Sequence, residues 1–156
     1  MRFILLDRIC ALEPGASIRA EKTLFADEEL FKDHFPGFPV VPGVLLTEMM
    51  AQAAGKCLDA EGRPRGRAML AQIRSANFRN WVRPGETAEI TASITSSQDA
   101  VATAKCHIDV AGKRVASAEL MFAFAPHALF AVSQRDDLLD AFLSQGDRGA
   151  KPEGAR

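Results

Sequence analysis

The sequence predicts an α+β fold in which an antiparallel sheet wraps round one long helix. Two observations predict it: a strongly apolar helical segment at about residues 43–60, and five or six segments with the pattern of strands. The chain has 156 residues. This length is sufficient for one domain that buries its own core.

The strand candidates alternate apolar and polar residues between turn residues. Residues 86–96 show the clearest alternation, and Gly112-Lys113 marks the turn of a hairpin. The candidates are residues 3–12, 16–25, 67–78, 86–96, 101–110 and 115–125. Segment 67–78 also fits a helix by periodicity alone. The antiparallel sheet therefore has five strands, or six if this segment is a strand.

The helix predicted for residues 43–60 carries more apolar residues than a surface helix does. Its polar residues Glu48, Gln52 and Lys56 recur every four residues and form one narrow line. Such a line is typical of surface side-chain pairs. However, an ionisable group in so apolar a helix also suits a functional site.

The chain divides into a main domain at residues 1–125 and a C-terminal extension at residues 126–156, with Pro126 at the boundary. Within the extension, residues 136–143 are predicted to form a short amphipathic helix. Residues 146–156 contain no large apolar side chain, and we expect a flexible tail there.

Composition excludes several classes of function. Nineteen basic and twenty acidic residues give a net charge of -1, which argues against nucleic-acid binding driven by bulk charge. No apolar run reaches the roughly 18 residues that a membrane span needs. The cysteines Cys10, Cys57 and Cys106 do not form a disulfide framework and fit a reducing cytoplasm. Cys106 and His107 point to opposite faces of a strand, so we expect no metal site there.

The most unusual segment lies directly before the predicted helix. Three prolines and two glycines within residues 36–43 fix an irregular backbone path that leads to a helix N-terminus. His34 lies at the start of this path and Glu48 lies on the helix. Either residue alone fits an ordinary surface position. Together, an imidazole base and a carboxyl group near free N–H groups suit proton abstraction next to a carbonyl.

The string HFPGFPVVPGVLLTEMMAQAAG, residues 34–55, resembles the signature of the FabZ-type 3-hydroxyacyl-acyl-carrier-protein dehydratases. The flanking strings LLDRICALEPG and ANFRNWVRPGET resemble the same family, so the resemblance covers roughly residues 3–125. It implies a hotdog fold, a homodimer that often assembles into a trimer of dimers, and a reaction without metal or redox cofactor.

The resemblance also implies roles for individual residues. His34 and Glu48 match the catalytic pair, which different subunits of a dimer contribute to one tunnel. Gly43 matches the glycine whose N–H polarises the thioester carbonyl, and Gln52 matches a glutamine that orients the carboxylate. The remaining substrate-binding candidates are Phe38 and Val44. Glu rather than Asp at position 48 indicates the FabZ branch rather than the FabA branch.

Two departures from the family pattern stand out. Asp33 precedes the histidine where the family usually has glycine, and the chain contains no tyrosine to gate the tunnel. The expected reaction is reversible dehydration of a 3-hydroxyacyl thioester on acyl carrier protein to the trans-2-enoyl thioester. The alternatives are a hotdog thioesterase, a dehydratase of a polyketide-type side pathway, or a non-catalytic acyl-binding subunit.

Basic residues provide candidates for docking the acidic carrier protein. Arg63, Arg65 and Arg67 form a basic loop that is either solvated or used for docking, and Arg79 and Arg83 are the alternatives. The expected partners are therefore acyl carrier protein and further copies of this chain. No nucleic acid or membrane partner is expected.

Overall fold

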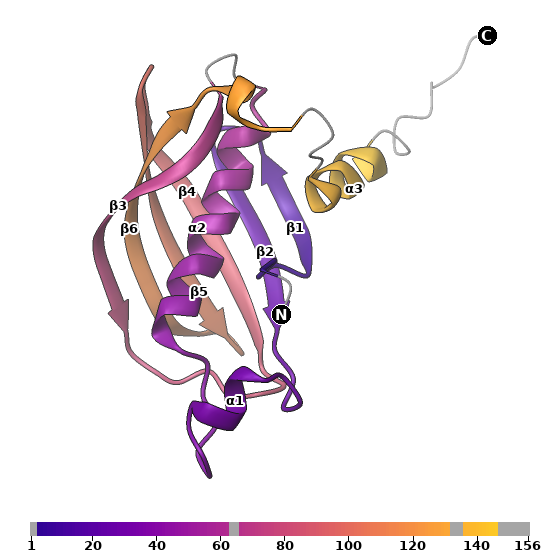
Figure 1. Ribbon diagram of the computed structural model, residues 1–156, viewed down its shortest axis with the longest axis vertical. Coiled ribbons are helices and arrows are strands. Elements are labelled where there is room, and N and C mark those ends of the chain that lie inside the picture. The colour runs from indigo at the N-terminus through magenta and orange to yellow at the C-terminus, as the bar shows by residue number, and fades with distance from the viewer. Residues whose placement is uncertain (1–2, 63–65, 132–135, 147–156) are drawn as a thin grey trace, which may run out of the picture.

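The computed structural model describes residues 3–62, 66–131 and 136–146. In this part of the chain a six-stranded antiparallel sheet curves round one long helix, as predicted (Figure 1). The strand order is β1-β2-β4-β5-β6-β3. The strands are β1 (Arg8–Glu13), β2 (Ser17–Thr23), β3 (Arg67–Phe78), β4 (Thr87–Ser97), β5 (Val101–Val110) and β6 (Lys113–Ala125). The helices are α1 (Leu30–Asp33), α2 (Gly43–Asp59) and α3 (Asp137–Gly146), with a 3-10 turn η1 (His127–Leu129).

Several predicted boundaries were wrong for local reasons. The first strand begins at Arg8 rather than residue 3, because the Leu5 N–H donates to the side chain of Gln52 instead of joining the sheet. The ambiguous segment 67–78 is a strand, since it pairs along its length with β6. The hairpin turn consists of Ala111 and Gly112, both at positive φ, so β6 begins at Lys113. The C-terminal helix runs from residue 137 to 146.

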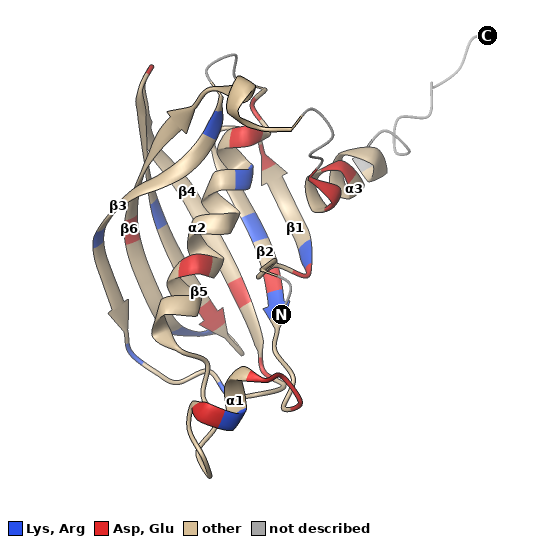
Figure 2. Cartoon of the chain, in the orientation of Figure 1, with Lys and Arg blue, Asp and Glu red and all other residues tan. Residues whose placement is uncertain are grey.

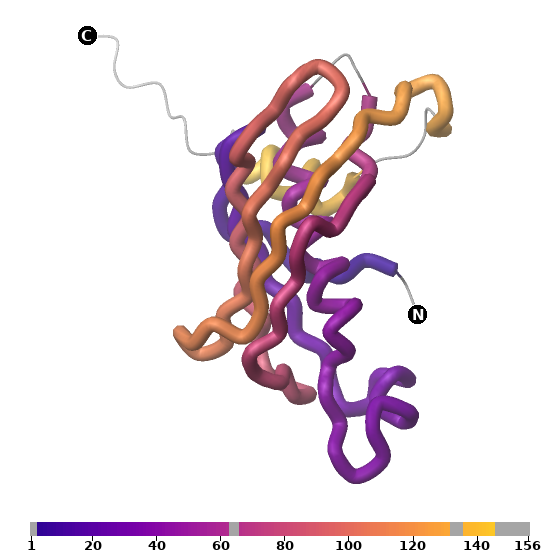
Figure 3. Tube along the Cα trace, turned by 90° about the vertical axis from the view of Figure 1, so that its left-hand side faces the viewer, coloured from indigo at the N-terminus to yellow at the C-terminus, as the bar shows by residue number. Residues whose placement is uncertain are grey.

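Helix α2 lies against the concave face of the sheet, as the two views at right angles show (Figures 1 and 3). Small side chains on β4, β5 and β6 allow the helix backbone to approach the strands closely. The fully or almost fully buried alanines of these strands are Ala88, Ala92, Ala102, Ala104, Ala116 and Ala118. Larger side chains from the helix, such as Met49, Met50 and Leu58, fill the remaining space.

Strand β3 forms one edge of the sheet, and its outer edge has no neighbouring strand among the described residues. It is twelve residues long and exposes the apolar side chains of Met69, Leu70 and Ile73, which are 48%, 39% and 49% accessible. Long exposed apolar edges readily pair with another strand. Among the described residues, the sheet therefore ends at β3 in a long edge strand with exposed apolar side chains.

The C-terminal extension packs on the main domain through α3, which contacts β1. Leu139 is buried in the common core, and Leu138 and Phe142 pack against it. The Arg67 guanidinium lies 5.2 Å from the centre of the Phe130 ring. The predicted tail lies outside the described residues from position 147 onward, and the division at residue 125 remains a prediction. Within the described ranges, no helix is long and apolar enough to cross a membrane.

Gly66, directly before β3, should tolerate no side chain. Its φ is +120°, and an added Cβ would lie 1.8 Å from the Ala125 carbonyl oxygen. We expect Gly66→Ala to lower the free energy of unfolding by about 3 kcal/mol or more. Gly112 is the control, because its φ is +78° with nothing within 4 Å of an added Cβ. Gly112→Ala should cost only about 1 kcal/mol. Urea unfolding measures both, and equal losses would contradict this account.

Candidate active site

His34 is held in a fixed orientation at the end of α1. Its backbone N–H donates to the Leu30 carbonyl at 3.1 Å, and its Nδ1 lies 3.0 Å from the Val40 carbonyl oxygen. Because a carbonyl only accepts hydrogen bonds, Nδ1 carries the proton in this contact. The other ring nitrogen, Nε2, is then left with a lone pair and can act as a base.

The proline-rich loop connects His34 to the start of α2 by backbone hydrogen bonds. The Val40 N–H donates to the His34 carbonyl at 3.1 Å, and Val41 donates to the Val82 carbonyl at 2.8 Å. Phe35 and Phe38 exchange two further backbone hydrogen bonds. The side chains of Val40 and Val41 are also buried. Both the backbone and the side chains therefore hold this loop in place.

The N-terminus of α2 presents N–H groups for which the described residues provide no hydrogen-bond acceptor. The N–H groups of Leu45 and Leu46 both donate to the Pro42 carbonyl, so those of Gly43 and Val44 have no acceptor within the helix. A Cβ at Gly43 would lie 3.2 Å from the ring of Phe78, a tight contact. Glycine at this position therefore allows an aromatic ring to pack on the helix start beside the free N–H groups.

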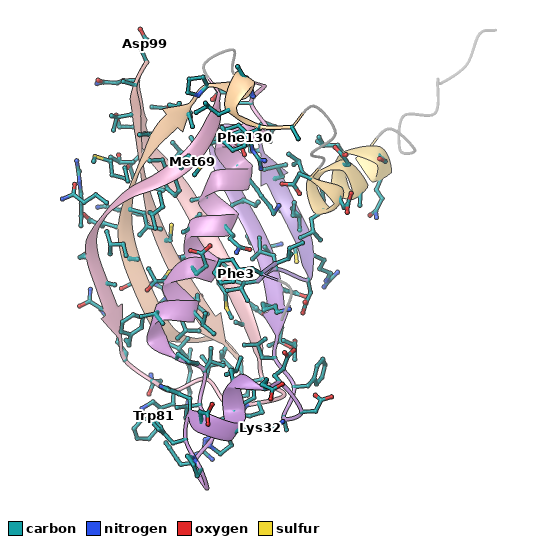
Figure 4. The ribbon with its side chains drawn as sticks, viewed as in Figure 1. Phe3, Lys32, Met69, Trp81, Asp99 and Phe130 are labelled. Atoms are coloured by element: carbon teal, nitrogen blue, oxygen red, sulfur yellow. The ribbon has the colours of Figure 1, made fainter. Side chains whose placement is uncertain are left out.

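Val44 and Phe38 are exposed in the single chain. The side chain of Val44 is 75% accessible. Phe38 packs edge-on against Trp81, with ring centres 5.1 Å apart, and the Arg83 guanidinium lies 5.2 Å from its ring centre. Figure 4 shows Trp81 beside α1, at the lower end of the molecule.

Glu48 and Gln52 form a connected pair on α2. The Gln52 amide Nε2 donates to Glu48 Oε1 at 3.1 Å, and Gln52 Oε1 accepts the Leu5 N–H at 2.8 Å. Gln52 thereby fixes the Glu48 carboxylate and also ties residues 3–5 to the helix. Figure 4 places Phe3 over the middle of α2.

Glu48 and Gln52 line a groove of about 970 Å³ along α2. Residues 3–7, the start of β3 and the start of α3 form its other walls. The groove does not include His34, and no hydrogen bond or ion pair joins His34 to Glu48 within the described part of the chain. Within the described part of one chain, the two predicted catalytic residues therefore share neither a polar contact nor this groove.

Helix α2 carries few charged residues, which Figure 2 shows as isolated coloured bands on a mostly tan helix. Lys56 forms an ion pair with Asp136 of the C-terminal extension. Asp59 accepts the Ala68 N–H at 2.8 Å and lies 3.5 Å from Arg67 Nε. Burial raises the pKa of Asp59 above its usual range, although the Ala68 N–H and Arg67 oppose this shift.

Sequence reasoning missed two features of the site. Nothing in the pattern around Phe78 indicated that its ring packs on Gly43, and the Lys56–Asp136 pair joins residues 80 positions apart. Of the proposed basic docking residues, Arg67 is engaged by Asp59 and Phe130. Arg63 and Arg65 lie outside the described residues.

A curved antiparallel sheet round a central helix, with a histidine on the loop that enters the helix, defines a hotdog-fold protein with acid–base groups. Comparison with known proteins identifies the family. Residues 1–119 match the model of the FabA-like domain. The chain belongs to this family, and its relatives lie in the FabZ branch.

The FabZ dehydratase of Listeria welshimeri is 38% identical over 124 residues, which are 79% of this chain and 86% of that protein. The FabZ dehydratase of Ruminiclostridium cellulolyticum is also 38% identical, over 122 residues that cover 78% and 86% of the two chains. Among solved structures, a hypothetical thioesterase with coenzyme A from Streptococcus pneumoniae superposes with a TM-score of 0.63. That match is 12% identical over 76% of this chain and 88% of the other, so it shows the fold alone.

Proposed function

We propose that this protein catalyses the reversible dehydration of a 3-hydroxyacyl thioester on acyl carrier protein to the trans-2-enoyl thioester. The observation that carries this proposal is a histidine fixed by the Val40 carbonyl on the loop that leads into α2, together with a Glu48 side chain that Gln52 holds on that helix. Family membership and the FabZ relatives support it.

In the proposed reaction, the thioester carbonyl accepts a hydrogen bond from the Gly43 N–H at the positive end of the α2 dipole. Negative charge developing on the carbonyl oxygen is stabilised there, which acidifies the proton on C2. Nε2 of His34 takes this proton. The electron pair then forms the double bond between C2 and C3 while the bond from C3 to the hydroxyl oxygen breaks. Glu48 supplies a proton to that oxygen, and water leaves.

We further propose that the two groups act in one site only when two chains associate. The supporting observations are the separation of His34 from the Glu48 groove and the exposed apolar edge of β3. Pairing of two β3 edges would give a continuous sheet and place the α2 helices of both chains on the same side of it. His34 of one chain then faces Glu48 of the partner subunit. Three such dimers form the hexamer that the family resemblance implies.

An assay with 3-hydroxybutanoyl-acyl-carrier-protein tests the reaction. Formation of the enoyl thioester supports the dehydratase. Release of a free thiol would identify a thioesterase instead, and binding without either product would identify a non-catalytic acyl-binding subunit. Running the assay from the enoyl thioester as well tests reversibility.

Gln52 should act as a positioning residue for Glu48. Gln52→Met keeps the length of the side chain but removes the hydrogen bonds to Glu48 and Leu5. Because a small displacement of a catalytic group is costly, we expect kcat to fall by up to about 10²-fold with little change in KM. Gln52→Glu retains an acceptor for the Leu5 N–H but loses the donor to Glu48. It therefore measures the loss of the Glu48 contact separately from that of the Leu5 contact. Unchanged kcat in Gln52→Met would contradict the positioning role.

A further inference from the structure

The groove that contains Glu48 reaches the C-terminal extension. Its lining follows α2 from Glu48 through Lys56 to Asp59, and it includes Asp136, Asp137 and Leu138 of the extension. We infer that this extension is the end wall of the acyl-binding groove and sets the longest acyl chain that the protein accepts. This inference rests on the proposed function, because it assigns the groove to the acyl chain of that substrate.

The groove is lined by both apolar and charged side chains, and its apolar part is the surface that an acyl chain would contact. The apolar lining comes from several separate elements. Its members include Phe3, Ile4, Leu24, Ala51, Leu70 and Phe122. At about 1.5 Å per residue, Lys56 lies about 12 Å along the helix axis from Glu48. An acyl chain whose reacting carbons lie at Glu48 therefore runs along α2 towards the extension.

The end of the groove is held in place by polar contacts. Lys56 and Asp136 form an ion pair, and their side chains are only 16% and 17% accessible. The other carboxylate oxygen of Asp136 accepts the Leu139 N–H at 3.1 Å, so Asp136 also caps the start of α3. A longer acyl chain would have to separate a half-buried ion pair, which leaves both charges poorly solvated.

Packing fixes the position of the wall as well. Leu139 is 8% accessible and belongs to the core, while the neighbouring Leu138 faces the groove. Because the match to the FabA-like family model ends at residue 119, this wall is built from a segment beyond the matched domain. The extension thus adds a limit on chain length to a site whose reacting groups belong to the family domain.

Binding of saturated acyl-pantetheine thioesters of increasing length, measured by isothermal titration calorimetry on the full chain, tests the inference without turnover. Each buried methylene should raise the affinity about fourfold until the chain meets the wall. Leu138→Ala should extend this rise by roughly two methylene groups, since the space left by the side chain becomes available. Leu138→Trp should shorten it. Leu143→Ala is the matched control, because Leu143 lies on the same helix but is exposed and does not line the groove.

The same limiting length in the native chain and both Leu138 variants would overturn the inference, and so would the absence of any thioester binding. The dehydration assay decides the proposed function separately. If the chain binds thioesters with the expected dependence on length but forms no enoyl product, the role of the extension is supported and the proposed dehydratase activity is refuted.

Discussion

Replacing His34 by alanine or Glu48 by glutamine is expected to lower the dehydration rate by about 10²–10⁴-fold each. Both side chains are only half-buried and lie outside the main core, so neither change should lower the melting temperature appreciably. Because the two groups act on one substrate in one reaction, their effects should not add in the double variant. Steady-state kinetics and a thermal melt measure these results, and full activity in either single variant would refute the catalytic assignment.

Subunit mixing extends this test to the shared site. In a dimer of one His34→Ala chain and one Glu48→Gln chain, one site carries both defects and the other carries neither. Random exchange forms mixed dimers about half the time, so about a quarter of the native sites should return. Each variant taken alone through the same exchange procedure is the control. No recovery after demonstrated exchange would place both residues of a site on the same chain.

The second large effect is expected at the free edge of the sheet. Ile73→Lys places a charge on β3, where a strand of the partner subunit would pair, and charged edges resist such pairing. We expect a monomer in size-exclusion chromatography with light scattering. Activity should fall by about 10²-fold or more, because in the proposed arrangement a single chain does not bring the two reacting groups into one site.

Leu129→Lys is the control for the edge variant. Leu129 is also exposed, at 74%, but lies on η1 rather than on β3. It should leave both assembly and activity unchanged. An Ile73→Lys protein that remains a fully active dimer would show that the chains associate through another surface.

The central helix and most strands were predictable because their apolar residues follow the helical and strand periods. Segment 67–78 was ambiguous because an edge strand with apolar residues on exposed positions does not alternate clearly. The start of β1 was missed because a side chain, Gln52, captured the backbone of residues 3–5. A hydrogen bond from a distant side chain to the backbone leaves no pattern of apolar and polar residues in the segment that it holds.

For the site, the sequence indicated candidate residues but not how they are arranged. The spacing of His34 and Glu48 gave their positions on a loop and a helix, and it gave no distance between them in space. Glu48, Gln52 and Lys56 looked like a solvated surface line. In the structure, Gln52 instead holds the N-terminal segment and Lys56 holds the C-terminal extension. Both partners are distant in the sequence, so local patterns could not reveal them.

The alanines beneath α2 make the protein unequally tolerant of mutation. The distance between the helix and the strands is set by the methyl groups of these alanines, and a methyl group is already the smallest side chain after glycine. Shortening these side chains would therefore leave only a small cavity. A larger residue at Ala92 or Ala104 would instead push the whole helix away from the sheet. Glu48 would move with it, relative to the histidine that another chain supplies in the proposed dimer. We therefore expect these alanine positions to tolerate larger residues poorly, although none of them is a residue of the proposed site.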